Sequence, residues 1–200
     1  MKNNLILIGG GGHCRSCIDV IELENKFKIK AIVDLPENIG KKILGYTIQY
    51  RDKDLESLVS KYKNVFISLG QIKDPSLRIN TFQKLQYMGA HFPKIISPRA
   101  YVSPHAQIGE GTIVMHDAII NANAKVMDNS IINTKALIEH DAFVGSHCHI
   151  ATGAIVNGDA KVFEGSFVGS NAVLKQGITI GKKRVIPAGE RMMNSLQEEL

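Results

Sequence analysis

The stretch "ALIEHDAFVG", residues 136–145, places His140 between Glu139 and Asp141 in a run of otherwise small and apolar residues. An imidazole, whose ordinary pKa is about 6.5, can accept a proton at neutral pH. A neighbouring carboxylate can fix the tautomer of the ring and stabilise the imidazolium. These residues could form a general base with its orienting acid, provide a metal ligand, or lie on the surface without a function. Which of these roles applies depends on the strands and turns that position these side chains.

A run of four glycines, Gly9 to Gly12, connects the first predicted strand with a predicted helix. Glycines let the backbone approach a phosphate closely, and a helix N-terminus favours an anion. Asp34 ends the next predicted strand, where a dinucleotide-binding protein would hold the ribose. A dehydrogenase is therefore one interpretation, although Cys14 replaces the third glycine of its fingerprint and a second mononucleotide-binding half is missing. A tight turn with close helix packing is another.

The chain has three cysteines, Cys14, Cys17 and Cys148, an odd number that does not suggest a disulfide framework. Cys14 and Cys17 form a C-x-x-C at a helix start, where a redox dithiol could lie. No other thioredoxin feature follows, and cysteine packs well as a small apolar residue. We therefore expect all three to be packing residues.

The first 95 residues alternate between strand and helix patterns. Strands are predicted at residues 5–10, 28–34 and 64–70, and helices at residues 14–25, 52–62 and 75–89. Pro75 suits the first turn of the last helix and Gly89 its end. Strands that alternate with helices indicate a parallel sheet covered by helices, so residues 1–95 are predicted to form a Rossmann-like α/β domain.

From Ile96 the period changes to six residues. Aliphatic side chains occupy every sixth position, at Ile96, Val102, Ile108, Val114, Ile120, Val126, Ile132, Ile138, Val144, Ile150, Val156, Val162, Val168, Leu174, Ile180 and Ile186. A small residue follows four positions later in all but the last coil. This period fits a solenoid of parallel β coils, in which three hexads make one triangular coil. Residues 96–200 are predicted to form such a prism without an inserted loop, ending near Ile186 in a short tail.

The hexad array resembles that of the left-handed β-helix acyltransferases. The sequences "GGGGH" at residues 9–13 and "SLG" at residues 68–70, together with Asp34 and Arg78, make the N-terminal half similar to one branch of them. That branch is the bacterial sugar acetyltransferases, which include sialic-acid O-acetyltransferases and UDP-4-amino-sugar N-acetyltransferases of bacillosamine synthesis. The resemblance covers nearly the whole chain and includes "NTKALIEHD" at residues 133–141. It implies a Rossmann-like α/β domain followed by a left-handed parallel β-helix of hexapeptide repeats.

The resemblance implies an acetyl-CoA-dependent N-acetyltransferase that acts on the amino group of a nucleotide-linked 4-amino-sugar in bacterial glycan biosynthesis. His140 is implied as the catalytic base and Asp141 as the acid that hydrogen-bonds to it. Contacts with the substrate are implied for Gly10, Gly11, Gly12, His13, Asp34, Gly70 and Asn133, and contacts with acetyl-CoA for His149 and Gly153. Family members have a second acid after Asp34, but this chain has Leu35, so the nucleotide base stays open.

The residues leave room for other functions. The same base could remove a hydroxyl proton in the O-acetylation of a sialic-acid-like sugar. A non-catalytic sugar-nucleotide-binding partner could keep the scaffold, but it would not need His140. Zinc enzymes with this prism gather three histidines, whereas one coil from His140 the sequence has Ala122 and Gly158, so no metal is expected.

The composition adds further expectations. The net charge of +5 is scattered, apart from "GKKR" at residues 181–184, and the aromatic residues form no stacking series, so nucleic-acid binding is not expected. No apolar run approaches the ~20 residues of a membrane span, and no signal-peptide pattern opens the chain. We therefore expect a cytoplasmic protein.

The resemblance also implies an oligomeric state. The family is trimeric, with acetyl-CoA between adjacent prisms, which implies a homotrimer.

Overall fold

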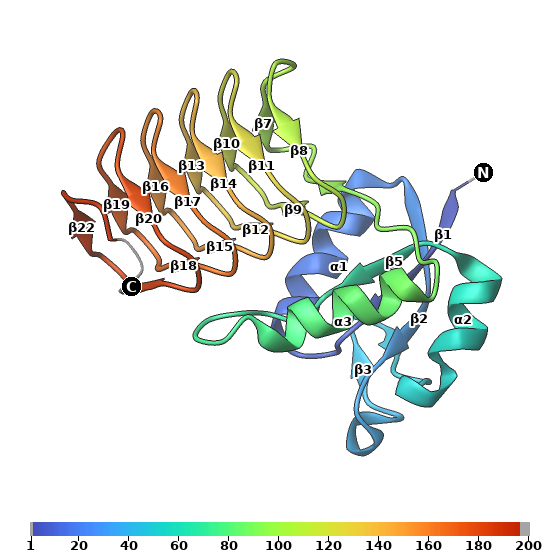
Figure 1. Ribbon diagram of the computed structural model, residues 1–200. Coiled ribbons are helices and arrows are strands. Elements are labelled where there is room, and N and C mark those ends of the chain that lie inside the picture. Colours follow the sequence, from blue (N-terminus) through green and yellow to red (C-terminus); the bar gives the residue numbers. More distant parts are fainter. Residues whose placement is uncertain (1, 197–200) are drawn as a thin grey trace. The chain divides into compact units, whose positions relative to one another are not determined.

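The computed structural model describes residues 2–196 of the chain, which form two compact units (Figure 1). The first unit contains the residues up to Gly70 and Ser76–Ile95, and the second contains Gln71–Pro75 and the residues from Ile96 onward. The segment Gln71–Pro75 thus belongs with the repeat unit, which no sequence pattern indicated.

The first unit is built on three parallel strands in the order β2-β1-β5. The strands are β1 (Asn3–Ile8), β2 (Phe27–Val33) and β5 (Val65–Ile67), and the helices are α1 (Gly12–Glu24), α2 (Leu55–Tyr62) and α3 (Ser76–Tyr87). Their core consists of aliphatic and aromatic side chains, including Ile6, Val33, Leu58, Ile67 and Phe82. The predicted alternation and parallel sheet are confirmed.

A small hairpin in the first unit was not predicted. Its strands are β3 (Lys42–Ile43) and β4 (Tyr46–Thr47), and short 3-10 helices lie at Pro36–Asn38 and Asp52–Asp54. The hairpin turn consists of Leu44 and Gly45, both with positive φ, at 46° and 87°. Two such residues make a turn whose twist suits a hairpin, but asparagine or aspartate normally stands where Leu44 does, so the sequence signal was weak.

The second unit is a parallel β-helix of two-residue strands arranged in three sheets. The β13 face contains β7 (Tyr101–Val102), β10 (Ile119–Ile120), β13 (Leu137–Ile138), β16 (Ile155–Val156), β19 (Val173–Leu174) and β22 (Arg191–Met192). The β14 face contains β8 (Gln107–Ile108), β11 (Lys125–Val126), β14 (Phe143–Val144), β17 (Lys161–Val162) and β20 (Thr179–Ile180). The β15 face contains β6 (Ile95–Ile96), β9 (Ile113–Val114), β12 (Ile131–Ile132), β15 (His149–Ile150), β18 (Phe167–Val168) and β21 (Val185–Ile186).

The register of these sheets confirms the predicted coil of three hexads. Ile120 pairs with Ile138, and Val126 with Val144, so each residue lies beside the one a full coil further along the chain. The second residue of each strand points into the prism, where the aliphatic side chains form one continuous core with the small corner residues. The strands recur every six residues from β7 to β22 without an insertion (Figure 1). One strand, β22, lies beyond the predicted end near Ile186.

Many corners of the prism contain a residue in the left-handed conformation, three positions after the inward aliphatic. Examples are Asn123 (φ 60°), Asp141 (φ 63°) and Asn171 (φ 57°). Asparagine, aspartate and glycine tolerate this conformation best, because their side chains are short or absent. Polar side chains are therefore presented at the corners by the turn geometry itself.

The three cysteines are buried and free of disulfides. Burial raises the pKa of the Cys14 and Cys17 thiols above their ordinary value, and raises that of Cys148 to about 12. A thiol that stays protonated is a poor nucleophile, which supports the packing interpretation. No helix among residues 2–196 is long and apolar enough to cross a bilayer.

Candidate active site

His140 and Asp141 lie at the corner between the β13 face and the β14 face. The Nδ1 atom of His140 lies 2.8 Å from Oδ2 of Asp141. Because a carboxylate accepts, Nδ1 carries the proton and Nε2 is the free, basic nitrogen. The hydrogen bond with Asp141 is the main cause that raises the pKa of His140 above its ordinary value, and the charges of Asp141 and Glu139 act in the same direction.

Asn123 contacts the same carboxylate from the preceding coil. Its Nδ2 donates to Oδ1 of Asp141 at 2.6 Å, so the two oxygens of Asp141 are held by Asn123 and His140. These two hydrogen bonds, with that from Asn123 the larger cause, keep the pKa of Asp141 below its ordinary value. Asp141 is therefore ionised at neutral pH and can stabilise an imidazolium.

On one side of this corner is a hollow of 560 Å³ with an acidic lining. It is lined by Glu139, His140, Asn157, Gly158, Asp159, Gln176 and Gly177. Two of these residues are carboxylates, and none is a lysine or arginine. The His140 ring lies against Gly158 of the next coil, where an added Cβ would come within 2.9 Å of the ring. The basic nitrogen of His140 thus belongs to a site suited to an amine or another cation.

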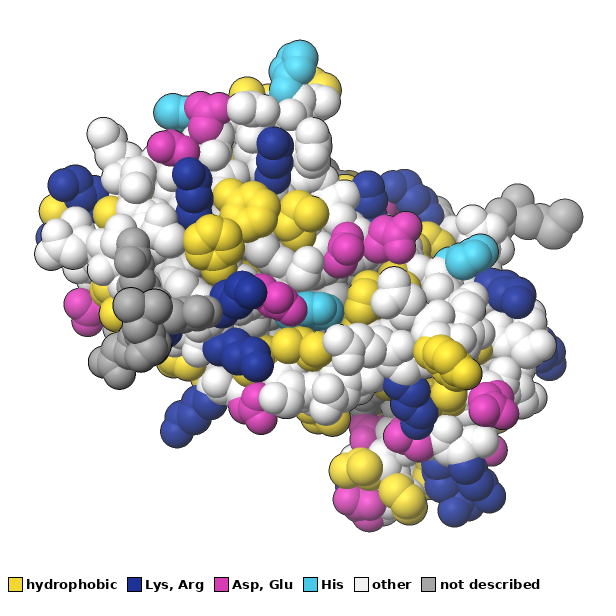
Figure 2. Space-filling view, in the orientation of Figure 1, with side chains coloured by type: hydrophobic (Ala, Val, Ile, Leu, Met, Phe, Trp, Pro, Cys, Tyr) yellow, Lys and Arg dark blue, Asp and Glu magenta, His cyan; other side chains and the backbone are white. Residues whose placement is uncertain are grey.

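On the other side of Asp141 is a hollow of 330 Å³ with basic and aromatic side chains. Its lining includes Lys125, Phe143, Lys161 and Phe163, together with Asn123, Asp141 and Ala142. The Phe143 and Phe163 rings are 5.9 Å apart, and Phe143 pairs with Lys125 of the preceding coil and with Lys161 of the next coil. Hydrophobic and basic side chains lie together over this part of the coils in Figure 2. Such a surface suits a molecule with a planar ring and phosphate groups.

The structure brings Asn133 and His149 together, away from the corner that carries His140. His149 belongs to the β15 face and is 7% exposed. Its Nδ1 lies 2.6 Å from the carbonyl oxygen of Gln71, and its Nε2 lies 3.1 Å from Nδ2 of Asn133. The ring is thus held by the segment Gln71–Pro75 and by the preceding coil.

Gln71 and Gly153 each have a structural role in the coils. The side-chain amide of Gln71 donates to the carbonyl oxygens of His147 at 2.9 Å and Gly165 at 3.3 Å. Gly153 has φ 67°, and a Cβ there would collide with Oδ1 of Asn171 in the next coil. The left-handed turn and the contact with Asn171 together therefore favour a glycine at position 153.

The glycine run and Asp34 form a second cluster, within the first unit. The Gly10 N–H donates to Oδ2 of Asp34 at 2.5 Å, and Oδ1 accepts from the Leu35 N–H at 2.6 Å. Helix α1 begins at Gly12 with Gly11 as its N-cap, and no side chain caps it. A Cβ added at Gly11 or Gly12 would meet nothing within 4 Å. An open helix N-terminus of this kind is suited to a phosphate.

The end of β5 lies beside this cluster. Ser68 donates to the carbonyl oxygens of Ile8 at 3.0 Å and Gly9 at 2.6 Å, and Arg78 donates to that of Leu69 at 2.6 Å. Burial lowers the pKa of Arg78 to about 10, so it remains protonated at neutral pH. A Cβ at Gly70 would lie 3.5 Å from that of His13. His13 and Gly70 are thus neighbours.

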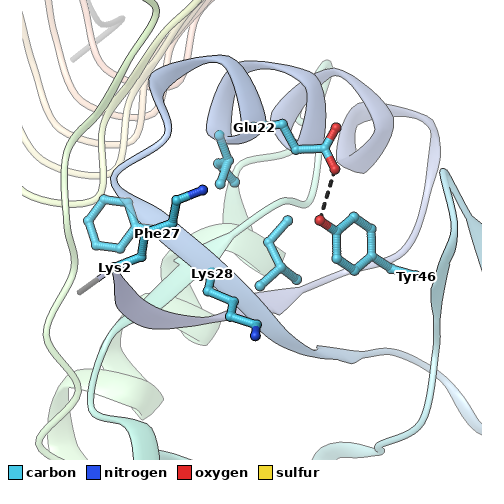
Figure 3. A pocket seen from close by; sticks show the side chains of 7 residues that line it. Lys2, Glu22, Phe27, Lys28 and Tyr46 are labelled. Carbon is cyan, nitrogen blue, oxygen red and sulfur yellow. Dashed lines mark hydrogen bonds between the residues drawn. The ribbon is translucent and has the colours of Figure 1, made fainter.

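A further hollow of 530 Å³ lies at the outer edge of β2. Figure 3 shows Lys2, Phe27 and Lys28 around it, with Tyr46 of β4 donating to Glu22 of α1 at 2.8 Å. Burial and the interaction with Glu22 raise the pKa of Tyr46 to about 12. None of the residues predicted from the sequence to act in the site lines it.

The β13 face carries an apolar ladder on its outside. The outward residues are aliphatic or aromatic on five successive strands, at Tyr101, Ile119, Leu137, Ile155 and Val173. Ile119 is 40% exposed and Tyr101 is 55% exposed. The corner with His140 directly follows β13, so it borders this ladder. An exposed apolar strip of this kind is typical of a subunit contact.

The sequence predicted the His140–Asp141 pair but missed Asn123 and Gly158. Asn123 precedes Asp141 by one coil, and Gly158 follows His140 by one coil, so the period of three hexads was the signal that could have found them. Among residues 2–196, no three His, Cys, Asp or Glu side chains are grouped so that they could hold a metal ion.

Comparisons with known proteins identify similar chains. Residues 4–85 match the family model described as the PglD N-terminal domain. PerB from Caulobacter crescentus, solved in complex with CoA and GDP-perosamine, is 30% identical, with 99% of this chain and 92% of that chain covered and a TM-score of 0.91. None of the curated protein sequences is detectably similar to the chain.

Two other solved structures are similar over nearly their whole length. The acetyltransferase domain of PglB from Neisseria gonorrhoeae, in complex with acetyl coenzyme A, is 26% identical, with 99% of this chain and 94% of that chain covered and a TM-score of 0.89. WeeI from Acinetobacter baumannii is 20% identical, with 100% and 95% covered and a TM-score of 0.86, which shows the shared fold.

Proposed function

Because the chain belongs to the left-handed β-helix sugar N-acetyltransferases, we propose that it transfers the acetyl group of acetyl-CoA to the amino group of a nucleotide-linked 4-amino-sugar. PerB was solved with CoA and GDP-perosamine, and the PglB domain with acetyl coenzyme A. The observation in this chain that carries the proposal is the His140–Asp141 hydrogen bond, which leaves Nε2 basic beside an acidic hollow.

The reaction follows from this geometry. The neutral amine nitrogen attacks the thioester carbonyl carbon, and Nε2 of His140 takes the proton that the nitrogen must lose. Asp141 stabilises the imidazolium that forms. When the C–S bond breaks, the imidazolium returns the proton to the CoA thiolate. The products are the acetylated amine and CoA, and His140 is neutral again.

The lining of the two hollows supports an amine acceptor. Glu139 and Asp159 would attract an ammonium group and repel the carboxylate of a sialic acid, so the alternative of sialic-acid O-acetylation is disfavoured. Lys125 and Lys161, beside Phe143, would attract the phosphates of a nucleotide-bearing substrate. The acidic hollow on one side of the corner thus suits the amino group of the acceptor sugar, and the basic hollow on the other side suits a substrate that carries phosphates.

For the first unit we propose binding of the sugar nucleotide. The N–H groups at the start of α1, with Gly11 and Gly12 open in front of them, would hold its phosphates. Asp34 holds the glycine run through Gly10 and would lie near the ribose or base. His13 and Gly70 complete this proposed site.

For Asn133, His149 and Gly153 the direct contacts with substrate and acetyl-CoA stay predictions. In the single chain His149 is buried against Gln71 and Asn133. We propose that these residues shape the wall of a site completed by a second copy of the chain. The exposed apolar ladder beside His140 supports assembly, and a homotrimer is the state we propose.

We also propose that the reaction needs no metal ion and takes place in the cytoplasm. The step derived above uses only the proton transfers of His140 and the charge of Asp141. Acetyl-CoA and sugar nucleotides are cytoplasmic compounds, so an enzyme that joins them would act there.

A panel of acceptors tests the function. The protein is incubated with acetyl-CoA and UDP-, GDP- and dTDP-linked 4-amino-sugars, or with free sialic acids, and released thiol is measured. We expect thiol release with at least one amino-sugar nucleotide, none with sialic acids, and no rate change on treatment with a chelator. His140→Ala should abolish most of the rate, whereas the matched control His105→Ala, an exposed histidine of another coil, should keep it. Thiol release with sialic acids alone would contradict the proposal.

A further inference from the structure

We propose that Asn123 is a positioning residue of the acetyl transfer, which holds Asp141 in the orientation that His140 requires. This inference rests on the proposed function, because it assigns Asn123 its role through the base. None of the sequence patterns that identified His140 and Asp141 includes Asn123, which lies on the preceding coil.

The coil geometry places Asn123 directly below Asp141. Both residues stand at the same corner of successive coils and both have left-handed backbones, with φ of 60° and 63°. The Asp141 N–H donates to the carbonyl oxygen of Ala122 at 3.2 Å, which joins the two turns. Nδ2 of Asn123 then reaches Oδ1 of Asp141 at 2.6 Å, while Oδ2 receives Nδ1–H of His140 at 2.8 Å.

The pair needs such a support because it is exposed. The side chains of His140 and Asp141 are 65% and 49% exposed. An exposed pair with one hydrogen bond keeps its geometry only part of the time, since side-chain entropy and water compete with it. A second hydrogen bond, from a turn fixed by the coil register, removes the free rotation of the carboxylate.

An amide is the side chain that this role requires. The Nδ2–H group of Asn123 donates at any pH and has no proton to exchange with Asp141. A lysine or arginine there would neutralise the carboxylate and make His140 less basic. Asparagine also tolerates the left-handed backbone of position 123.

The charged residues around the His140 ring come from its own turn and from the next coil. Glu139 and Asp141 belong to its own turn, and Asp159 belongs to the next coil, where it lies 4.0 Å from Nζ of Lys161. Asn123 from the preceding coil adds no charge. Its removal therefore changes the orientation of Asp141 without changing the number of charges around the ring.

The test measures the titration of His140 and Asp141 by NMR in the full-length protein, together with kcat. In Asn123→Ala the pKa of Asp141 should rise, because its carboxylate loses the hydrogen bond from Asn123. The pKa of His140 should fall, because the carboxylate that accepts its Nδ1–H is no longer held in place. The kcat should fall about three- to tenfold, the range of one net hydrogen bond, with KM values nearly unchanged. Asn123→Asp keeps the size and turn preference but replaces the donor by an acceptor, so its kcat should fall further.

A double-mutant cycle separates positioning from stability. Once Asp141→Asn has removed the charge, Asn123→Ala should lower kcat no further. Asn171→Ala controls for the backbone, because Asn171 occupies the same turn position of another hexad with φ 57°. It should lower the Tm as Asn123→Ala does and leave both pKa values unchanged.

The two failures are distinguishable. Unchanged pKa values of His140 and Asp141 in Asn123→Ala, or an additive loss of kcat in the cycle, would overturn the role of Asn123 even if His140 is the base. Retention of kcat by His140→Ala would overturn the base in the proposed function, and the role of Asn123 in catalysis with it, whatever the titration shows.

Discussion

The imidazole ring of His140 lies on the backbone of Gly158, the residue one coil further along the chain. A Cβ at position 158 would come within 2.9 Å of Cε1 and 3.0 Å of Nε2. Successive coils are about 4.8 Å apart, and the exposed ring can lie against the next coil because position 158 has no side chain. Gly158 thus sets the position of the nitrogen that we propose as the base.

The first prediction concerns this contact. Gly158→Ala should displace the His140 ring and lower kcat by roughly 10²-fold, the cost of a misplaced catalytic group. The backbone of Gly158 has no positive φ, so alanine adds no backbone strain, and the Tm should stay within a few degrees of the parent. Steady-state kinetics and thermal unfolding check this. A parental kcat would show that the ring position does not matter.

The second prediction concerns the base itself. His140→Ala should lower kcat by roughly 10²–10⁴-fold, the range for a positioned proton acceptor. Substrate KM values should change much less, because the imidazole acts mainly in the transition state. Asp141→Asn should lower kcat by a smaller factor, since it orients and stabilises the ring. Neither change should alter the Tm much, because both side chains are exposed.

The third prediction concerns pH. His140 accepts a proton only when it is neutral, and Asp141 raises its pKa above the ordinary value. The rate should therefore fall as the pH drops through this raised pKa and be restored above it. In Asp141→Asn the acidic limb should move to lower pH, because the main cause of the raised pKa is lost. The amine acceptor also titrates, so the two profiles must be compared with the same substrate. Coincident acidic limbs would contradict the pairing.

The repeat explains why much of the fold could be predicted. A six-residue aliphatic period determines which side chains point inward, so coil length, register and the corner of His140 followed from counting. The hairpin at Leu44 and Gly45 was missed because its turn lacks the usual residues. The packing of Gln71–Pro75 on the coils was missed because it depends on tertiary contacts of Gln71 with His147 and Gly165.

The candidate site was predicted less completely, for a related reason. Motif spacing along the chain identifies neighbours in sequence, such as His140 and Asp141. Asn123 and Gly158 are neighbours only through the stacking of coils, and their types, an exposed asparagine and a glycine, are common at corners. His149 was predicted as a contact of acetyl-CoA, but its hydrogen bonds with Gln71 and Asn133 became visible only in the folded chain.

The fourth prediction tests the glycine run. Gly11→Ala should raise the KM for the sugar nucleotide several-fold and leave the KM for acetyl-CoA nearly unchanged, because its Cβ enters open space in front of α1. Gly10→Ala is the contrast. Its Cβ would lie 2.7 Å from both Oδ2 of Asp34 and Cδ1 of Ile48, so it should lower the Tm instead. Equal increases of both KM values in Gly11→Ala would indicate that the glycines serve folding alone.

The last prediction concerns assembly. Sedimentation or light scattering should give a mass of about three times that of the 21.9 kDa chain, as the family implies. Ile119→Lys should weaken the assembly, because it places a charge in the exposed apolar ladder of the β13 face. If two copies complete the site, activity should fall as the measured mass of the assembly falls.

Co-expression of two inactive chains tests whether copies share the site. One chain carries His140→Ala, and the other carries Gly11→Glu, which would repel the phosphates of the sugar nucleotide. If the base of one copy faces the nucleotide held by another, mixed assemblies contain sites with an intact His140 and an intact Gly11, and part of the activity returns. If both groups serve one site within a single chain, every site is defective and no activity returns. A single-chain mass with full activity would reject the shared site outright.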